Sequence, residues 1–234
     1  MSFQVLPADQ RLVISSKLKR GQINGLIREG FRVVVFNPRG VRIPQKSDSI
    51  YDFTEITSDL DFALDHIKSK HKDSSLYLLG TSYGACYGIK YLSQFNHEKK
   101  IKGMVSIANP FNMYESAKSL KTIPHYIYGY YLTSGLINKV KFNLQNISRM
   151  SKHRNIEFNF DDVKDKTNTF DYDKEFTFKF SDYDNPQDFY TEISCHQHVK
   201  NVNVPLLIIN SKNDPISLYY NKSHFPANGR HKEE

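Results

Sequence analysis

The sequence predicts an α/β fold, with a mostly parallel sheet whose strands are joined by crossover helices. Between residues 21 and 108, short runs rich in Val, Ile and Leu alternate with longer segments whose apolar residues recur at helical spacing. That alternation is typical of a parallel sheet. The chain has 234 residues, 39% of them hydrophobic, which is enough for one domain with a sizeable core.

The first elements follow an N-terminal segment, residues 1–22, that the sequence does not place, although residues 4–6 and 11–14 are candidate short strands. Residues 23–30 carry apolar side chains at helical spacing and end in a glycine, as helices often do. Residues 31–36 are β-branched and nearly all apolar. We expect them to form a strand buried on both faces of the sheet.

The middle of the chain continues the pattern. Residues 54–70 predict a helix, residues 76–79 a strand followed directly by a helix to about residue 95, and residues 102–108 the next strand. The apolar face predicted for the first of these helices consists of Ile56, Leu60, Phe62, Ala63, Leu64 and Ile67.

Residues 111–190 interrupt the alternation and predict an insertion between two strands. Residues 126–132 are an aromatic stretch compatible with a helix, and Phe176, Phe178 and Phe180 recur at every second position. An insertion of this size either forms a cap with apolar walls over the active site or packs its aromatic residues on itself. The sequence leaves both alternatives open.

The sheet pattern returns at residues 204–210, and a polar tail, residues 217–234, ends the chain without a further predicted strand. We therefore expect a single domain over residues 1–234. It would comprise the unplaced N-terminal segment, the sheet with its helices, the cap-like insertion and the tail.

The motif Gly80-Thr81-Ser82-Tyr83-Gly84 carries the predicted chemistry. It has the G-x-S-x-G pattern of a nucleophile elbow, a sharp turn between a strand and a helix. The turn strains the backbone of the middle residue, and glycines two positions away avoid clashes. Ser82 is therefore the candidate nucleophile, at a helix N-terminus where N–H groups and the helix dipole favour a developing negative charge.

A serine nucleophile needs a base to accept its proton and a carboxylate to hold that base. Asp214 follows the strand predicted at residues 204–210 and precedes Pro215, which suits the acid of such a site; an ordinary loop aspartate is the alternative. His224 and His231 are the only histidines after Asp214, and both lie in the polar tail. The sequence therefore leaves the catalytic histidine unknown.

The charge and cysteine content exclude several classes of protein. The 32 Lys and Arg residues exceed the 25 Asp and Glu residues, for a net charge of +7, but they are scattered along the chain. This indicates a solvated basic surface with no nucleic-acid partner, and weak attraction to an anionic membrane is the alternative. The two cysteines, Cys86 and Cys195, form no disulfide framework and indicate a cytoplasmic compartment. No run approaches the length of a membrane span, so we expect at most peripheral membrane contact.

We predict neither a metal site nor a cofactor. The run Cys195-His196-Gln197-His198 lacks a second ligand cluster, which makes a helix start the better interpretation. No glycine-rich phosphate loop is present. Cys86, four residues after Ser82, is interpreted as a small core residue, and the oligomeric state is not predicted.

Several blocks of the sequence taken together resemble one known family. They are residues 31–41, 63–67, the motif at 80–84, residues 194–196, residues 204–210 and Asp214-Pro215. They resemble the YheT-type branch (AB hydrolase 4) of the AB hydrolase superfamily. The match covers roughly residues 24–110 and 188–217, while the insertion differs.

The resemblance implies an α/β-hydrolase fold and a serine esterase or lipase that acts on medium-chain esters, acylglycerols or phospholipids through an acyl-enzyme. Ser82 matches the nucleophile of the family and Asp214 its acid. The backbone N–H of Tyr83 matches one of the two oxyanion donors. The expected partner is thus an ester or lipid substrate.

The sequence departs from the family at both ends. The early strand with a His-Gly loop, which supplies the second oxyanion donor, has no recognisable counterpart in residues 1–22, and the final strand with its histidine is not found after Asp214. We therefore expect a chain truncated at both ends, whose activity the sequence leaves open. The alternative is a catalytically inactive, hydrolase-like protein that binds a lipid or a protein partner.

Overall fold

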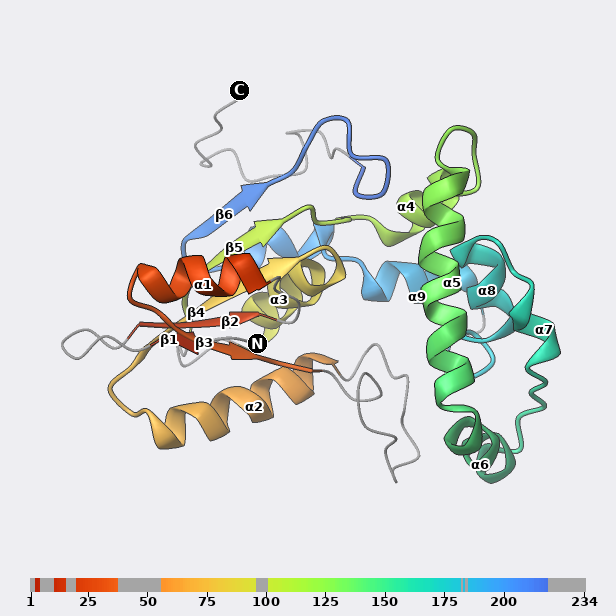
Figure 1. The fold of residues 1–234 in the computed structure, drawn as a ribbon, viewed down its shortest axis with the longest axis horizontal. Coiled ribbons are helices and arrows are strands. Elements are labelled where there is room, and N and C mark those ends of the chain that lie inside the picture. The colour runs from red at the N-terminus through yellow and green to blue at the C-terminus, as the bar shows by residue number, and fades with distance from the viewer. Residues whose placement is uncertain are drawn as a thin grey trace.

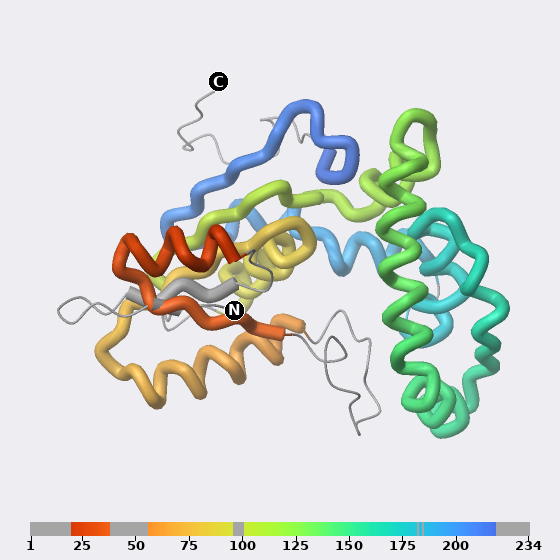
Figure 2. Tube along the Cα trace, in the orientation of Figure 1, coloured from red at the N-terminus to blue at the C-terminus, as the bar shows by residue number. Residues whose placement is uncertain are grey.

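A sheet forms one part of the computed structural model, and a group of helices lies beside it (Figures 1 and 2). The structure describes residues 3–4, 11–15, 20–37, 56–95, 101–181, 183 and 185–218. The strands are β1 (Phe3–Gln4), β2 (Arg11–Ser15), β3 (Arg32–Val35), β4 (Ser75–Thr81), β5 (Ile101–Ile107) and β6 (Leu206–Ile209). Together with the helices between them, they confirm the predicted α/β fold class.

The strands are hydrogen-bonded in the order β1-β3-β2-β4-β5-β6. The pairs β2–β3, β2–β4, β4–β5 and β5–β6 are parallel, and the short β1 pairs antiparallel with β3. The connecting helices include α1 (Arg20–Arg28), α2 (Ile56–Lys70) and α3 (Tyr83–Gln94). Because parallel strands end at the same edge, the segments that follow β4, β5 and β6 meet along one side of the sheet.

The prediction that the early strand has no counterpart in residues 1–22 is wrong. Strand β2 lies between β3 and β4, parallel to both, with Ile14 opposite Leu78. The strand is only five residues long and begins and ends with polar residues, so its sequence signal is weak. Residues 16–19, which follow it, lie outside the described residues.

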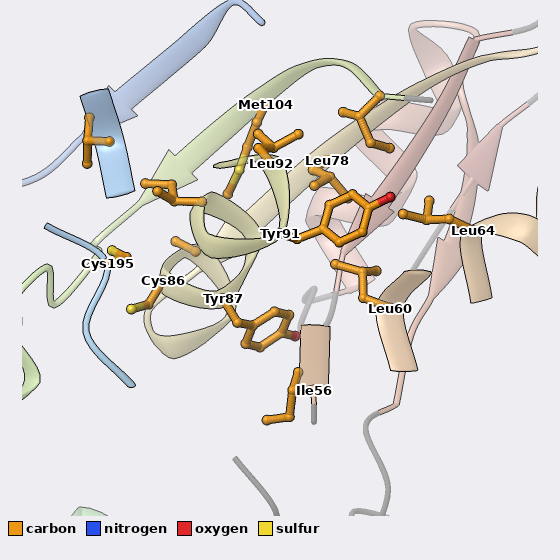
Figure 3. Packing of buried hydrophobic residues seen from close by; sticks show 14 of the residues in the cluster. Ile56, Leu60, Leu64, Leu78, Cys86, Tyr87, Tyr91, Leu92, Met104 and Cys195 are labelled. Atoms are coloured by element: carbon orange, nitrogen blue, oxygen red, sulfur yellow. The ribbon is translucent and has the colours of Figure 1, made fainter. Parts of the chain in front are cut away.

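The main core lies where α2 and α3 pack against one face of β4 (Figure 3). Leu76 and Leu78 of the strand contact a cluster that includes Leu64 of α2 and Tyr91 of α3, and each of these side chains is buried. The Tyr91 hydroxyl donates a hydrogen bond to the Asp61 carboxylate over 2.9 Å, so this tyrosine is buried with its polar atom paired. Full burial of each such leucine contributes about 1.5–3 kcal/mol. This packing fixes the strand and the helix that flank the predicted elbow.

Two details of the predicted core are wrong. Phe62 is 77% exposed, because it lies about 200° around helix α2 from Leu60 and from Leu64 and therefore on the opposite side. Strand β3 is not buried on both faces, and Val35 is 42% exposed. Among the described residues, its neighbour on the outer side is the two-residue β1, so β3 lies close to an edge of the described sheet.

The insertion between β5 and β6 is helical and forms the group beside the sheet (Figure 1). Its helices are α4 (Met113–Ser119), α5 (Tyr126–Phe142), α6 (Leu144–Arg154), α7 (Asp161–Lys164), α8 (Thr169–Glu175) and α9 (Pro186–Ile193). The aromatic helix predicted at residues 126–132 is confirmed as the first part of α5. The three phenylalanines belong to two different apolar clusters. Phe176 and Phe180 pack with α5 and α6, whereas Phe178 packs with α4 and α9.

Helix α9 returns the chain to the sheet and attaches the insertion to α3. The ammonium of the buried Lys90 donates hydrogen bonds to the Glu192 backbone carbonyl and, over 2.8 Å, to the Glu192 carboxylate. The thiol of Cys86 donates to the Ile193 carbonyl over 3.2 Å. Cys86 is fully buried, which confirms its interpretation as a core residue, and Cys195 immediately precedes the 3-10 helix η2 (His196–Asn201).

Candidate active site

Ser82 occupies the sharp turn between β4 and α3, with backbone angles φ 55° and ψ −131°. Such a conformation costs a residue with a side chain on the order of 1–3 kcal/mol and persists only when the surrounding structure holds it. The turn also needs Gly80: a Cβ atom there would lie 2.4 Å from the Ala85 Cα and 2.7 Å from the Ala85 nitrogen. The turn thus has the geometry of a nucleophile elbow.

Backbone hydrogen bonds hold the elbow in place. The N–H of Ser82 donates to the Ile107 carbonyl of β5 over 2.9 Å, and the Ser82 carbonyl accepts from the Ala85 N–H over 2.8 Å. The second bond begins helix α3, of which Tyr83 is the first residue. Ser82 is therefore at the positive end of a helix dipole, where an oxyanion is stabilised.

The neighbouring strand ends are joined to one another at the same edge of the sheet. Asn109, after β5, donates through its backbone N–H to the Asn210 side-chain oxygen over 3.1 Å, and the Asn210 amide donates back to the Asn109 carbonyl over 2.9 Å. The Ser217 hydroxyl donates to the Ala108 carbonyl over 2.6 Å. These bonds fix the loop after β6, which carries Asp214, against the residues that follow β5.

Asp214 itself is held by its own loop. One carboxylate oxygen accepts hydrogen bonds from the backbone N–H groups of Ile216 and Ser217, each over 2.9 Å. This turn uses one oxygen of the carboxylate in local structure. Since Asp214 follows β6 and Ser82 follows β4, with β5 between them, the topology brings the two predicted residues to the same edge of the sheet.

Aromatic residues of the insertion reach the elbow. Tyr83, next to the nucleophile, packs against the cluster formed by Ala117, Phe189, Tyr190 and Ile193, and also against the main core. Burial is the main cause of the strongly raised pKa of the Tyr83 hydroxyl. The insertion therefore supplies apolar packing directly beside the candidate nucleophile.

The insertion also supplies a buried carboxyl group that the sequence did not indicate. Asp173 of α8 accepts hydrogen bonds from the Thr177 hydroxyl over 2.6 Å and the Tyr190 hydroxyl over 2.7 Å. Burial raises the pKa of Asp173 to about 6, although both hydrogen bonds act in the opposite direction. Its charge is among the causes that raise the pKa of Tyr83, so the two residues lie within electrostatic range.

The histidine partner of Ser82 is not among the residues brought together here. His224 and His231 lie outside the described residues, as does His97. Two earlier histidines contact other groups: His71 lies 2.8 Å from an Arg32 guanidinium nitrogen, and His125 lies 2.7 Å from the Ser119 hydroxyl.

The part of the chain that the structure describes contains no group of three or more His, Cys, Asp or Glu side chains arranged to hold a metal ion. Within that same part, no helix combines the length and apolar character needed to cross a membrane. The predicted site residues among the described ones are Ser82, Tyr83 and Asp214.

Comparison with known proteins identifies the family. The family described as serine aminopeptidase, S33, matches residues 15–233, nearly the whole chain. The chain belongs to this family. It is thereby a member of the AB hydrolase superfamily, in agreement with the elbow geometry and with the sheet topology.

Proteins with curated names are similar to this S33-family chain over most of its length. The bovine (Bos taurus) protein named phospholipase ABHD3 is 27% identical over 192 residues, which cover 80% of this chain and 44% of the relative. The Saccharomyces cerevisiae protein named monoacylglycerol lipase is 22% identical over 188 residues, 80% of this chain and 41% of the relative. The chain thus spans less than half the length of these two relatives.

A solved structure supports the fold. An α/β fold family hydrolase from Bacillus anthracis matches with a TM-score of 0.53 and 15% identity over 93% of this chain and 79% of that one. At this identity the likeness concerns the fold alone. The S33-family chain described here therefore has an α/β-hydrolase fold.

Proposed function

We propose that this chain is a serine hydrolase of carboxylic esters, with lipid esters as its substrates and Ser82 as its nucleophile. The observation that carries the proposal is the backbone of Ser82, held at φ 55° and ψ −131° beside a glycine that admits no side chain. A strained serine between a strand and the N-terminus of a helix is the arrangement of the nucleophile in α/β-hydrolases. We also propose that the chain belongs to the YheT-type branch, on the sequence blocks given above.

The proposed reaction has two steps. The Ser82 hydroxyl oxygen attacks the acyl carbon and its proton passes to a histidine base; the tetrahedral intermediate then collapses, the histidine gives the proton to the leaving oxygen, and the alcohol departs from the acyl-enzyme. Water then attacks the acyl carbon and gives a proton to the histidine, the bond to the Ser82 oxygen breaks, and the histidine returns the proton to Ser82 as the carboxylic acid leaves. The N–H of Tyr83 donates to the oxyanion, and Asp214 orients the base. His224 and His231, which follow Asp214 in the chain, are the candidates for that base.

Two observations support a lipid substrate. Two curated relatives bear the names phospholipase and monoacylglycerol lipase. In addition, aromatic side chains of the insertion pack beside the elbow through Tyr83, which favours an apolar wall near an acyl chain. We therefore propose that residues 111–190 act as a cap over the site.

A fluorophosphonate probe tests the nucleophile, because it forms a covalent bond only with an activated serine. We expect the purified protein to be labelled and Ser82→Ala to remain unlabelled. Ser69→Ala, on the exposed surface of α2, is the matched control and should be labelled like the wild type. Equal labelling of Ser82→Ala would refute the assignment of the nucleophile. A folded wild-type protein without labelling would favour the non-catalytic, lipid- or protein-binding alternative.

A further inference from the structure

Helix α5 exposes a row of large apolar side chains on the outer side of the insertion. Ile123, just before the helix, is 92% exposed, Ile127 is 74% exposed and Tyr131 is 78% exposed. Phe142, at the end of the helix, is also exposed. Ile127, Tyr131 and Phe142 lie within about 60° of one another around the helix axis, so they share one side of α5, and Ile123 lies in the turn that precedes it. We call Ile123, Ile127, Tyr131 and Phe142 the α5 stripe.

The opposite side of the helix is firmly packed, so the stripe cannot turn inward without breaking the insertion. Gly129, Thr133 and Val140 are buried. A Cβ atom at Gly129 would lie 2.6 Å from the Leu120 carbonyl oxygen, which shows how closely the helix approaches the end of α4. Val140 belongs to the apolar cluster that joins α5 to α6 and α8.

The charged side chains of the segment that carries the stripe are all of one sign. Residues 116–156 contain no Asp or Glu, although the chain as a whole has 25 acidic residues among 234. The same stretch contains Lys118, Lys121, Lys139, Lys141, Arg149, Lys152 and Arg154. Lys121 is paired with Asp171 over 3.0 Å, whereas Lys141, Arg149 and Lys152 are exposed on α5 and α6. The stripe is therefore an apolar row within a cationic surface.

We propose that the α5 stripe is a docking surface for an anionic lipid bilayer, lying in the plane of the interface. Isoleucine and phenylalanine side chains enter the boundary between headgroups and acyl chains, while tyrosine rings lie at the headgroup level with the hydroxyl in water. The surrounding Lys and Arg residues attract anionic headgroups. The combination of apolar residues and one-signed charge distinguishes this surface from an ordinary solvated helix.

Docking through α5 would place the candidate active site near the lipid. Helix α5 packs against α8, and α8 and α9 both contact α4. The cluster that joins α4 to α9 also contacts Tyr83, next to Ser82. A continuous series of contacts thus links the helix that carries the stripe to the elbow. Binding to the bilayer does not depend on hydrolysis, so it can be tested separately from the proposed function.

Vesicle flotation tests the docking surface. We expect the full chain to bind phosphatidylcholine vesicles that contain phosphatidylserine, to bind pure phosphatidylcholine vesicles more weakly, and to lose binding as salt is added. The double variant Ile127→Glu/Tyr131→Glu should lower the partition coefficient about tenfold or more, since it removes apolar contacts and adds negative charge. Lys141→Glu should lower it roughly fivefold or more.

Matched variants distinguish docking through the stripe from non-specific adsorption to vesicles. Phe62→Glu removes a phenylalanine that is 77% exposed on α2, and it should bind vesicles like the wild type. Ser82→Ala should also bind like the wild type, whether or not the chain proves to be a hydrolase. Circular dichroism checks that each variant keeps its helices, which is expected because the substituted side chains are exposed.

Three outcomes would overturn the proposal. One is the absence of binding to phosphatidylserine vesicles, and another is binding by Ile127→Glu/Tyr131→Glu equal to that of Phe62→Glu. The third is an occupant other than lipid. If vesicles are not bound, and analytical ultracentrifugation shows a dimer for the wild type and a monomer for the double variant, the stripe is covered by a second copy of the chain. If the wild type binds single-stranded RNA in place of vesicles and the double variant does not, the stripe belongs to a nucleic-acid surface.

Discussion

Replacing Asp173 by asparagine should stabilise the protein at neutral pH and do so increasingly as pH rises. The carboxyl group is buried between Thr177 and Tyr190, and each of its oxygens accepts one hydroxyl hydrogen bond. Asparagine has nearly the same shape, and either hydroxyl can rotate to accept from its amide. The substitution therefore removes the buried charge and keeps most of the packing.

The magnitude follows from proton linkage. Burial raises the pKa of Asp173 from 3.8 to about 6, so in this interval the folded protein binds more protons than the unfolded chain. The stability that Asp173 contributes is therefore present at low pH and is lost as pH rises from 3.8 through about 6. The total loss is roughly 3 kcal/mol. Between about pH 5 and about pH 8, the free energy of unfolding of Asp173→Asn relative to the wild type should increase by about 1.4 kcal/mol.

Urea unfolding at several pH values measures this difference. The pKa values of His71 and His198 are lowered, mainly by burial, so these residues lower stability as pH falls; both occur in each protein and cancel in the comparison. Asp171→Asn, on the same helix, is the control. The pKa of Asp171 is lowered, chiefly by its hydrogen bond from Asn168, so its effect should be constant over this pH range. A pH-independent difference for Asp173→Asn would refute the reasoning.

The remaining predictions concern glycines whose surroundings differ. Gly80→Ala should destabilise the protein by about 3 kcal/mol or more in urea unfolding, because the new methyl group meets the backbone of Ala85; near-wild-type stability would contradict the elbow geometry. Gly129→Ala should lower the free energy of unfolding by about 1–3 kcal/mol, because its methyl group meets the Leu120 carbonyl. Gly135 lies on the same helix with open space around it, so Gly135→Ala should raise the free energy of unfolding by up to about 1 kcal/mol. If Gly129→Ala and Gly135→Ala changed stability in the same direction, the result would argue against this packing.

The elbow is the feature that the sequence alone predicted best. Its prediction depends on local geometry, since a strand, a tight turn and a helix within a few residues admit only certain residue types at Gly80 and Ser82. The alternation of strands and helices likewise predicted the sheet, because buried strands leave short continuous apolar runs and the helices between them leave apolar residues at helical spacing. Strand β2 was missed as the early strand, because its identity depends on pairing with β4 and β3 and not on its own five residues.

Only the tertiary structure decided which residues meet across long separations in the chain. The Asn109–Asn210 pair, the contact of Lys90 with Glu192 and the buried carboxyl of Asp173 arise from packing between elements that the sequence places far apart. Helical periodicity could not reveal that α5 buries Gly129 and exposes Ile127 and Tyr131, because its apolar residues occur on all sides. The sequence by itself determined the turn that carries the candidate nucleophile, and it determined the fold class, since both depend on local patterns. The surroundings of that turn depend on which surfaces pack together, and this packing is set by the whole fold.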